Sequence, residues 1–235
     1  MVEICLLGVW GALLTHGVSV MIQCAGRTAA PISDSRLAAI DQSIGFSTSA
    51  VVHWIANFPF WQRTFAIAYD SVMPLIILAL FLPVLCGHTR NAQRYLLAVV
   101  IGAAITGALY AFVPATGPWF AHGYQPSHDQ SMVQAYIEML KAGQWMRINQ
   151  ETAGVVTFPS FHTVLAILPI AAMWPIRHTR IPAIVVAVMI CMSTITTGWH
   201  YGIDVLGGLA VALLSHTLAN YGMRKLGYSS HFSAI

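Results

Sequence analysis

Two histidines in this chain lie in short polar segments next to long apolar runs. The first segment, TFPSFHTVLA at residues 157–166, places Ser160 and His162 at the expected start of a helix, with Thr157 as its cap and Pro159 in its first turn. Free backbone N–H groups and the helix dipole favour an anion at that position. A hydroxyl, exposed amides and an imidazole together suit a phosphate oxyanion and a proton donor for its leaving group.

The second segment, GWHYGID at residues 198–204, contains His200 and, four residues later, Asp204. A helix that begins near His200 would place both side chains on one face. A carboxylate that holds one imidazole nitrogen leaves the other free and basic, as a histidine nucleophile requires. The sequence therefore predicts a nucleophile with an orienting acid here, and a general acid at His162.

The elements that must position these residues are apolar. The chain is 57% hydrophobic and only 8% charged, with a mean hydropathy of +0.69 over 235 residues, whereas a soluble domain carries about 25% charged residues. This composition predicts an integral membrane protein with a single domain, residues 1–235. The net charge of +3 is then no sign of nucleic-acid binding, and the four cysteines show no metal-ligand spacing.

Six apolar runs are long enough to cross a bilayer core, which takes about 20 residues per helix. They are residues 4–25, 65–87, 93–113, 160–176, 181–198 and 202–223. The predicted fold class is therefore all-α: a polytopic membrane protein with six transmembrane helices and an extracytoplasmic interfacial active site.

Two segments between the spans are expected to lie at the membrane surface. Residues 27–63 include a short predicted helix in which Leu37, Ile40 and Ile44 recur at helical spacing, with Asp34 or Ser35 as its cap. Residues 114–159 form an extracytoplasmic loop that contains an amphipathic helix, MVQAYIEMLKAGQWM.

The distribution of basic residues predicts the orientation in the membrane. Tight connections on one side are basic and have almost no acids; they contain Arg90, Arg94, Arg177, Arg180, Arg224 and Lys225. The positive-inside rule makes that side cytoplasmic. Both termini are then cytoplasmic, and His162 and His200 meet on the extracytoplasmic side, which for a bacterium is the outer face of the inner (plasma) membrane.

The two histidine segments carry a family resemblance. PSFH at residues 159–162 and S-T-x5-H-x3-D at residues 193–204 resemble the second and third motifs of the type 2 phosphatidic acid phosphatase (PAP2) superfamily, usually Pro-Ser-Gly-His and Ser-Arg-x5-His-x3-Asp. The resemblance implies that His200 forms a phosphohistidine, that Asp204 orients it and that His162 protonates the departing alcohol. It implies a phosphate cradle around Ser160 and no metal or other cofactor. Ser193 either contacts the phosphate or bonds the backbone.

Departures from these motifs point to one branch of the superfamily. Thr194 stands where the third motif has arginine, and the first motif, Lys-x6-Arg-Pro, is replaced by YAFVPATGPWF. That proline-rich turn and the HYGIDV segment resemble the inositolphosphotransferase branch, which includes inositol phosphorylceramide synthases. Because bidentate arginine contacts are strong phosphate contacts, their loss favours a phosphodiester, which carries less charge. Arg147, and less so Lys141, is a candidate for a replacement charge from the loop.

Three further residues are candidates for substrate contact: Asp70, Tyr69 and Trp119. An intramembrane carboxylate is costly, so Asp70 either binds a headgroup or makes a structural hydrogen bond. Gly207 and Gly208 are expected to allow close helix packing. The expected partners are the bilayer and a lipid substrate, with no nucleic acid and no obligate protein partner.

The resemblance therefore implies a lipid phosphotransferase or phosphatase that transfers a phospho-headgroup to an alcohol acceptor. Three other functions are compatible with the sequence. The first is a lipid phosphate phosphatase that passes phosphate to water, and the second is a non-catalytic scaffold. The third is a transporter with a His/Asp proton relay, which would place ionisable residues at mid-membrane. The gathering of these residues at helix ends on one side favours an enzyme.

Overall fold

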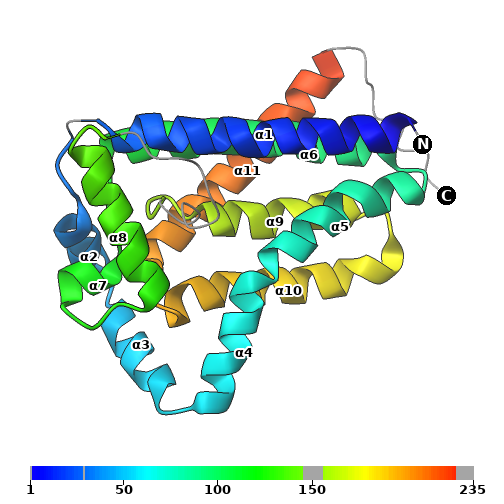
Figure 1. Cartoon of the computed structure of the whole chain (residues 1–235). Coiled ribbons are helices and arrows are strands. Elements are labelled where there is room, and N and C mark those ends of the chain that lie inside the picture. The colour runs from blue at the N-terminus through cyan, green and yellow to red at the C-terminus, as the bar shows by residue number, and fades with distance from the viewer. Residues whose placement is uncertain (1, 29, 145–155, 226–235) are drawn as a thin grey trace.

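The computed structural model describes residues 2–28, 30–144 and 156–225, which form helices and their connections without a strand. The all-α class is therefore confirmed for this part of the chain. The helices, shown in Figure 1, are α1 (Val2–Gly26), α2 (Asp34–Ser43), α3 (Thr48–Ala56), α4 (Pro59–Asp70), α5 (Val72–Leu85), α6 (Thr89–Phe112), α7 (Pro118–His122), α8 (His128–Lys141), α9 (Phe161–Met173), α10 (Arg180–Thr196) and α11 (Gly202–Lys225).

Three helical stretches in the described residues are long and apolar enough to cross a membrane: α6, α11, and α10 with the 3-10 turn before it. The pair α4 and α5 makes a fourth if it is counted as one span that bends by 40°. The apolar run 65–87 is thus a broken helix that begins earlier, at Pro59. The run 160–176 contains only the 13 residues of α9, about 20 Å of helix. Six spans remain a prediction.

Large apolar side chains are exposed along the outside of the bundle. They include Ile67, Leu85, Phe112, Ile181 and Leu213. Exposure of a continuous apolar surface is unfavourable in water, whereas contact with lipid tails is favourable. The apolar helices therefore suggest a membrane protein.

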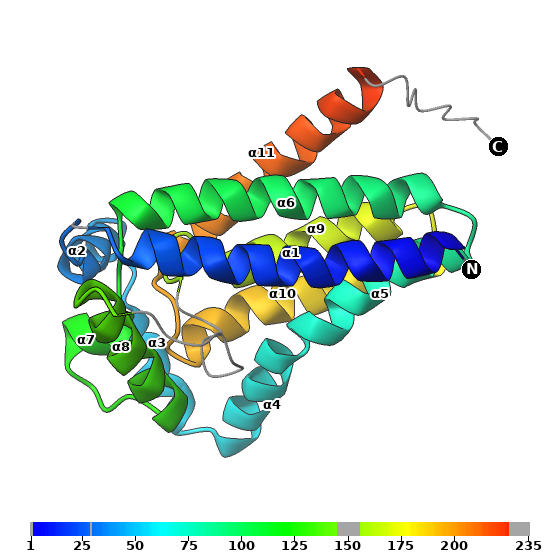
Figure 2. The same ribbon diagram turned by 45° about the horizontal axis from the view of Figure 1, so that its top comes forward.

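Helix α9 lies in the middle of the bundle and packs against α5, α6, α10 and α11 (Figure 2). Many buried residues around it are small, such as Ala98 on α6, Ala172 on α9 and Ala212 on α11. Small side chains let helix backbones approach closely, which supplies the packing contacts that hold helices together in lipid. The central helix is also the one that carries His162.

The start of α9 and the first turns of α11 approach each other closely at Gly208. A Cβ atom at this position would collide with the Ser160 carbonyl oxygen and would lie 2.8 Å from Thr163 Cβ. A Cβ at Gly207 would lie 3.1 Å from Pro159 and Phe158 atoms. The predicted close packing at both glycines is confirmed, and it brings the two histidine segments together.

The variant Gly208→Ala is therefore expected to separate α11 from α9. We expect the free energy of unfolding to fall by about 1–3 kcal/mol, as for other overpacked contacts, and lipid turnover to fall at least about tenfold, since misplacing catalytic groups by about 1 Å can cost a hundredfold. Gly222→Ala is the matched control on the same helix, because its nearest neighbour atom would be 3.9 Å away. Thermal unfolding and initial rates of purified protein measure both effects. Equal behaviour of the two variants would contradict this role for Gly208.

The short helix α2 forms where the sequence predicts one, but the three apolar residues at helical spacing do not share a buried face. Leu37 is buried, whereas Ile40 is 42% exposed and Ile44 57% exposed. The buried face instead contains Asp34, Leu37, Ala38 and Asp41. The reason is that both carboxylates bind backbone groups of distant segments, so the polar residues face inward. The cap also differs, since Ser33 precedes the helix.

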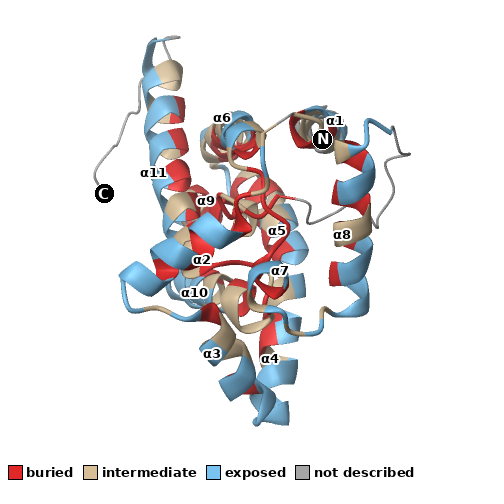
Figure 3. Cartoon of the chain, turned by 90° about the vertical axis from the view of Figure 1, so that its left-hand side faces the viewer, coloured by how far each residue is buried: buried red, intermediate tan, exposed pale blue. Residues whose placement is uncertain are grey.

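Helices α2, α3, α7 and α8 gather at one end of the bundle. Figure 3 views this end and shows buried segments in the centre, with exposed surfaces of these helices around them. The predicted amphipathic helix of the loop is α8, which begins with a capping box formed by Ser127 and Gln130. Lys141 at its other end donates to the Thr28 and Ala30 carbonyls, both at 2.8 Å.

The group of α2, α3, α7 and α8 is called the cap below. Two aspartates of α2 connect this cap to the rest of the bundle. Asp34 accepts hydrogen bonds from the Thr116 and Gly117 N–H groups, both at 2.8 Å, and from the Tyr201 hydroxyl at 2.9 Å. Asp41 accepts from the Gly202 and Ile203 N–H groups at the start of α11, both at 2.8 Å, and from the Thr48 hydroxyl at 3.0 Å.

Candidate active site

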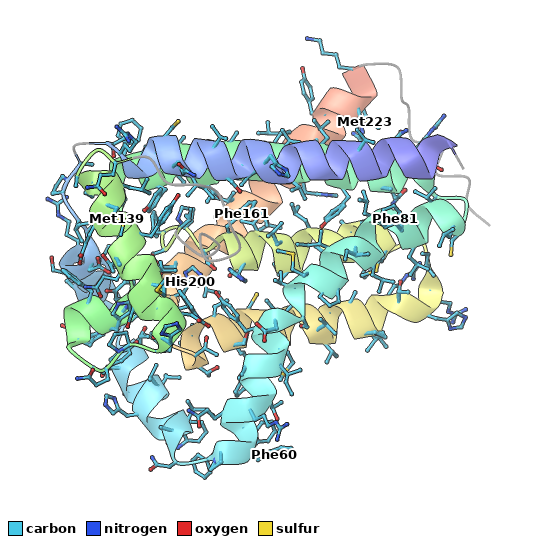
Figure 4. All side chains as sticks on the ribbon, in the orientation of Figure 1. Phe60, Phe81, Met139, Phe161, His200 and Met223 are labelled. Atoms are coloured by element: carbon cyan, nitrogen blue, oxygen red, sulfur yellow. The ribbon has the colours of Figure 1, made fainter. Side chains whose placement is uncertain are left out.

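His200 lies in the turn between α10 and α11, beneath the cap (Figure 4). The turn closes on the carbonyl oxygen of Thr194, which accepts from the backbone N–H groups of Trp199 at 3.1 Å and His200 at 3.0 Å. Helix α11 begins only at Gly202, so His200 precedes the helix rather than starting it. Its side chain is buried, with 3% of its surface exposed.

The ring of His200 is oriented by a backbone carbonyl. Its Nδ1 atom lies 2.9 Å from the Thr157 oxygen and 3.4 Å from Asp204 Oδ2. A carbonyl oxygen can only accept, so Nδ1 carries the proton and Nε2 keeps its lone pair in the neutral ring. Burial lowers the pKa of His200 from 6.5 to about 4, although the hydrogen bond to Thr157 opposes the shift. The ring is therefore neutral at pH 7, as a nucleophile must be.

Asp204 lies in the first turn of α11 and is fully buried. Its Oδ2 atom accepts from the Tyr201 N–H group at 2.7 Å, which caps the helix. Its Oδ1 atom has no hydrogen-bond partner within the described residues. The carboxylate thus has capacity left for a positive charge that develops on the neighbouring imidazole.

The PSFH segment differs in detail from its predicted arrangement. Ser160, not Thr157, is the cap of α9, since its hydroxyl oxygen accepts from the Thr163 N–H group at 3.3 Å. Pro159 therefore precedes the helix. Thr157 instead donates its hydroxyl to the carbonyls of Ala115 at 3.0 Å and Thr116 at 3.1 Å. Thr157 thus bonds the loop after α6 through its hydroxyl and His200 through its carbonyl.

Backbone contact also joins the two histidine segments directly. The Ser160 N–H group donates to the Asp204 carbonyl at 3.0 Å. His162, in the first turn of α9, then has its ring centroid 6.1 Å from that of His200. The structure thus brings together Ser160, His162, His200 and Asp204, at the N-terminal ends of α9 and α11.

Aromatic rings cover His162 on one side. Tyr69, near the end of α4, stacks on His162 at 4.4 Å and on Trp199 at 5.9 Å between ring centroids. Trp119 of α7 meets Trp199 edge-on at 5.7 Å and donates its indole N–H to Gln134 at 3.1 Å. Of the three candidates for substrate contact, Tyr69 therefore lies against a histidine, and Trp119 lies one ring further away. The third, Asp70, is exposed next to Tyr69.

Other candidate phosphate contacts lie elsewhere or are engaged. Ser193 is fully buried and donates its hydroxyl to the Ile190 carbonyl at 2.7 Å, so it bonds the helix backbone. Thr194 is likewise buried and donates to the Cys191 carbonyl at 2.8 Å. Lys141 is bound to the two backbone carbonyls described above. Arg147 lies outside the residues that the structure describes.

Several residues that position the site were missed in the sequence. The Thr157 carbonyl holds His200, while Asp34 holds Tyr201 and the loop after α6. Burial and the adjacent Asp34 carboxylate raise the pKa of Tyr201, so its phenol stays protonated and can donate. One signal was present: Asp34 and Asp41 are seven residues apart and share a helical face with Leu37. No sequence pattern marks a backbone carbonyl.

The described residues form helices that suggest a membrane protein, with the buried His200 and the half-buried His162 together at one end of the bundle. A sequence model of the PAP2 superfamily matches residues 35–218, which include both histidine segments. The chain therefore belongs to the PAP2 superfamily, and this membership suggests a phosphatase or phosphotransferase. No curated protein and no solved structure matches the chain.

Proposed function

We propose that the protein is a membrane-embedded lipid phosphotransferase or phosphatase that acts through a phosphohistidine on His200. The observation that carries the proposal is the hydrogen bond from His200 Nδ1 to the Thr157 carbonyl at 2.9 Å. It leaves Nε2 as the free nucleophilic atom of a neutral ring, a short distance from a second histidine. Two imidazoles in these positions suit nucleophilic attack and proton transfer on one phosphoryl group.

The reaction proceeds in two steps. In the first, His200 Nε2 forms a bond to phosphorus, the bond from phosphorus to the leaving alcohol breaks, and His162 gives its proton to that oxygen. The phosphorylated imidazole then carries positive charge, which the Asp204 carboxylate stabilises at 3.4 Å. In the second step an acceptor hydroxyl gives its proton to His162 and attacks phosphorus, which releases His200.

The phosphate group is held at the start of α9. Ser160 uses its oxygen to accept from Thr163, so its hydroxyl hydrogen is available to donate to the substrate. The free N–H groups of the first turn add to this cradle. Tyr69 and Trp199 supply an aromatic wall beside His162.

A phosphodiester suits this site better than a monoester. Thr194 occupies the position of the arginine in the usual motif, and its hydroxyl is turned to its own helix. A site with fewer cations favours the substrate with less negative charge. This supports the phosphotransferase branch and an alcohol acceptor over water.

The active site is proposed to face the extracytoplasmic side. The connections α5–α6 and α9–α10, seen in Figure 1, lie at the end of the bundle opposite His200, which Figure 4 labels in the same orientation. Arg177 lies in the connection α9–α10, and Arg180 is the first residue of α10. The positive-inside rule assigns that end to the cytoplasm.

A lipid panel assay tests the proposal. Purified protein is given matched lipid phosphomonoesters and phosphodiesters, with and without an alcohol acceptor, and products are identified by mass spectrometry. We expect the diester to react faster and the phospho-headgroup to reach the alcohol. A faster monoester would contradict the diester substrate, and release of phosphate only to water would indicate a phosphatase. If no lipid reacts or labels the protein, the enzymatic function is wrong.

A further inference from the structure

The two histidines of the proposed active site are oriented in different ways. His200 is held by the hydrogen bond between its Nδ1 atom and the Thr157 carbonyl. The ring of His162, in contrast, makes no hydrogen bond within residues 2–28, 30–144 and 156–225. It contacts the ring of Tyr69 at 4.4 Å and that of His200 at 6.1 Å between centroids. Tyr69 is the nearer of these two rings, so its contact can orient His162.

Tyr69 and His162 lie nearly face to face, since the planes of their rings differ by 24°. Stacked aromatic pairs attract each other at such distances, and the face of a tyrosine also attracts a cation within about 6 Å. The contact is therefore favourable for the neutral imidazole and for the protonated one. A general acid passes through both forms in each catalytic cycle.

Stacking orients an imidazole without using its nitrogens. A hydrogen bond, such as the one that holds His200, occupies one ring nitrogen. The stack with Tyr69 restricts the plane of the His162 ring and leaves both of its nitrogens for the substrate. This matters because the proton of a general acid has to reach the leaving oxygen and is later replaced by the proton of the acceptor hydroxyl. Stacking thus suits a general acid, as the hydrogen bond to the backbone suits a nucleophile.

A break between two helices brings the ring of Tyr69 to His162. Helix α5 packs against α9, whereas α4 packs mainly against α10. The two helices bend by 40° at Ser71, as Figure 1 shows for the path of the chain. Tyr69 lies two residues before Ser71, in the last turn of α4. Its side chain therefore sits at the corner from which it can reach the first turn of α9.

A second protein ring supports Tyr69. Trp199, the residue before His200, stacks on Tyr69 with centroids 5.9 Å apart and planes that differ by 14°, and Trp119 meets Trp199 edge-on. The Tyr69 hydroxyl makes no hydrogen bond in the part of the chain that the structure describes. The ring of Tyr69, rather than its hydroxyl, is thus the part that is engaged, and its partners are protein rings. This favours a role in positioning over contact with the substrate.

We propose that Tyr69 is a positioning residue, which holds the His162 imidazole by stacking in the orientation that protonates the leaving alcohol. The inference rests on the proposed function, in which His162 is the general acid. Tyr69 itself transfers no proton and forms no bond to the substrate.

Rates with two leaving groups test this role. Tyr69→Leu removes the ring and keeps apolar bulk, whereas Tyr69→Phe keeps the ring and removes the hydroxyl. Tyr221→Leu is the matched control, since Tyr221 is 66% exposed near the far end of α11. Each purified protein is given two lipid phosphodiesters. One has an alkyl alcohol as its leaving group, which needs a proton, and the other has nitrophenol, which leaves without one.

We expect Tyr69→Leu to lower kcat for the alkyl substrate about tenfold or more, because a catalytic group misplaced by about 1 Å can cost a hundredfold. Its kcat for the nitrophenyl substrate and its KM for both should match the wild type, as should all values for Tyr69→Phe and Tyr221→Leu. Equal losses with both substrates would indicate a structural role, a raised KM a substrate contact, and a slow Tyr69→Phe a role of the hydroxyl. Any of these results, or an unchanged Tyr69→Leu, would overturn the proposal.

The orientation of His162 is also measured without substrate. In protein that contains isotope-labelled histidine, the ring signal of His162 is identified by its loss in His162→Asn. NMR relaxation then gives the order parameter of this ring, which reports its motion on the ps–ns timescale. The order parameter should fall in Tyr69→Leu and stay unchanged in Tyr69→Phe; a value unchanged in Tyr69→Leu would contradict the positioning role. If the wild type turns over no lipid, the proposed function is wrong, whereas the order parameter still decides whether Tyr69 orients His162.

Discussion

Turnover of the lipid substrate is expected to fall by about four orders of magnitude or more when His200 is replaced by asparagine, because the nucleophile is removed. Asparagine places an amide nitrogen near the position of Nδ1, so the hydrogen bond to the Thr157 carbonyl can persist and the turn should keep its shape. Labelling of the protein by a lipid with radioactive phosphorus should disappear. In the wild type this label should be stable to base and released by acid, as expected for a phosphohistidine.

The variant His162→Asn distinguishes the proposed general acid, His162, from the proposed nucleophile, His200. Loss of a general acid costs about 10²–10⁴-fold in rate, but only when the leaving group needs a proton. With a nitrophenyl leaving group, the His162 variant should still form the phosphohistidine, whereas the His200 variant should not. His53→Asn, an exposed histidine of α3, is the matched control and should behave as wild type. Labelling that survives in the His200 variant would contradict the assigned nucleophile.

Asp41→Asn is expected to destabilise the protein strongly. Asp41 is 2% exposed, and its two oxygens accept from two backbone N–H groups at the start of α11. In asparagine one oxygen becomes an NH₂ group, so a donor meets a donor. We expect a loss of about 3 kcal/mol, which corresponds to a fall in Tm of roughly 6–12 °C for a protein of this size.

The same substitution should slow the reaction at temperatures well below the Tm. The first turn of α11 carries Asp204, and a shift of this turn moves the carboxylate away from His200. Asp129→Asn is the control, since Asp129 is exposed in the first turn of α8. If both variants unfold at the wild-type temperature, Asp41 does not hold α11 in the way described.

The sequence predicted local features better than distant contacts. Apolar runs marked the helices because lipid-facing helices need long apolar stretches, and the glycines at 207 and 208 marked the close approach of α9 and α11. Asp34 and Asp41 were missed because their partners are backbone groups more than 80 and 160 residues away. Every residue except proline has a backbone N–H group, so no residue type in the sequence marks such a donor. The contact of Tyr69 with His162 depends on the break at Ser71 and was likewise beyond local pattern.

The contact between His200 and the Thr157 carbonyl has a consequence for how this site can change over time. Every amino acid supplies a main-chain oxygen, so replacement of the residue at 157 preserves the acceptor as long as the chain follows the same path. The link from the Ser160 N–H to the Asp204 carbonyl has the same property for every residue except proline at 160. The backbone path, and not the residue type at 157, therefore fixes the reactive tautomer of His200. Distant relatives can differ at the motif positions around it and still keep the same chemistry.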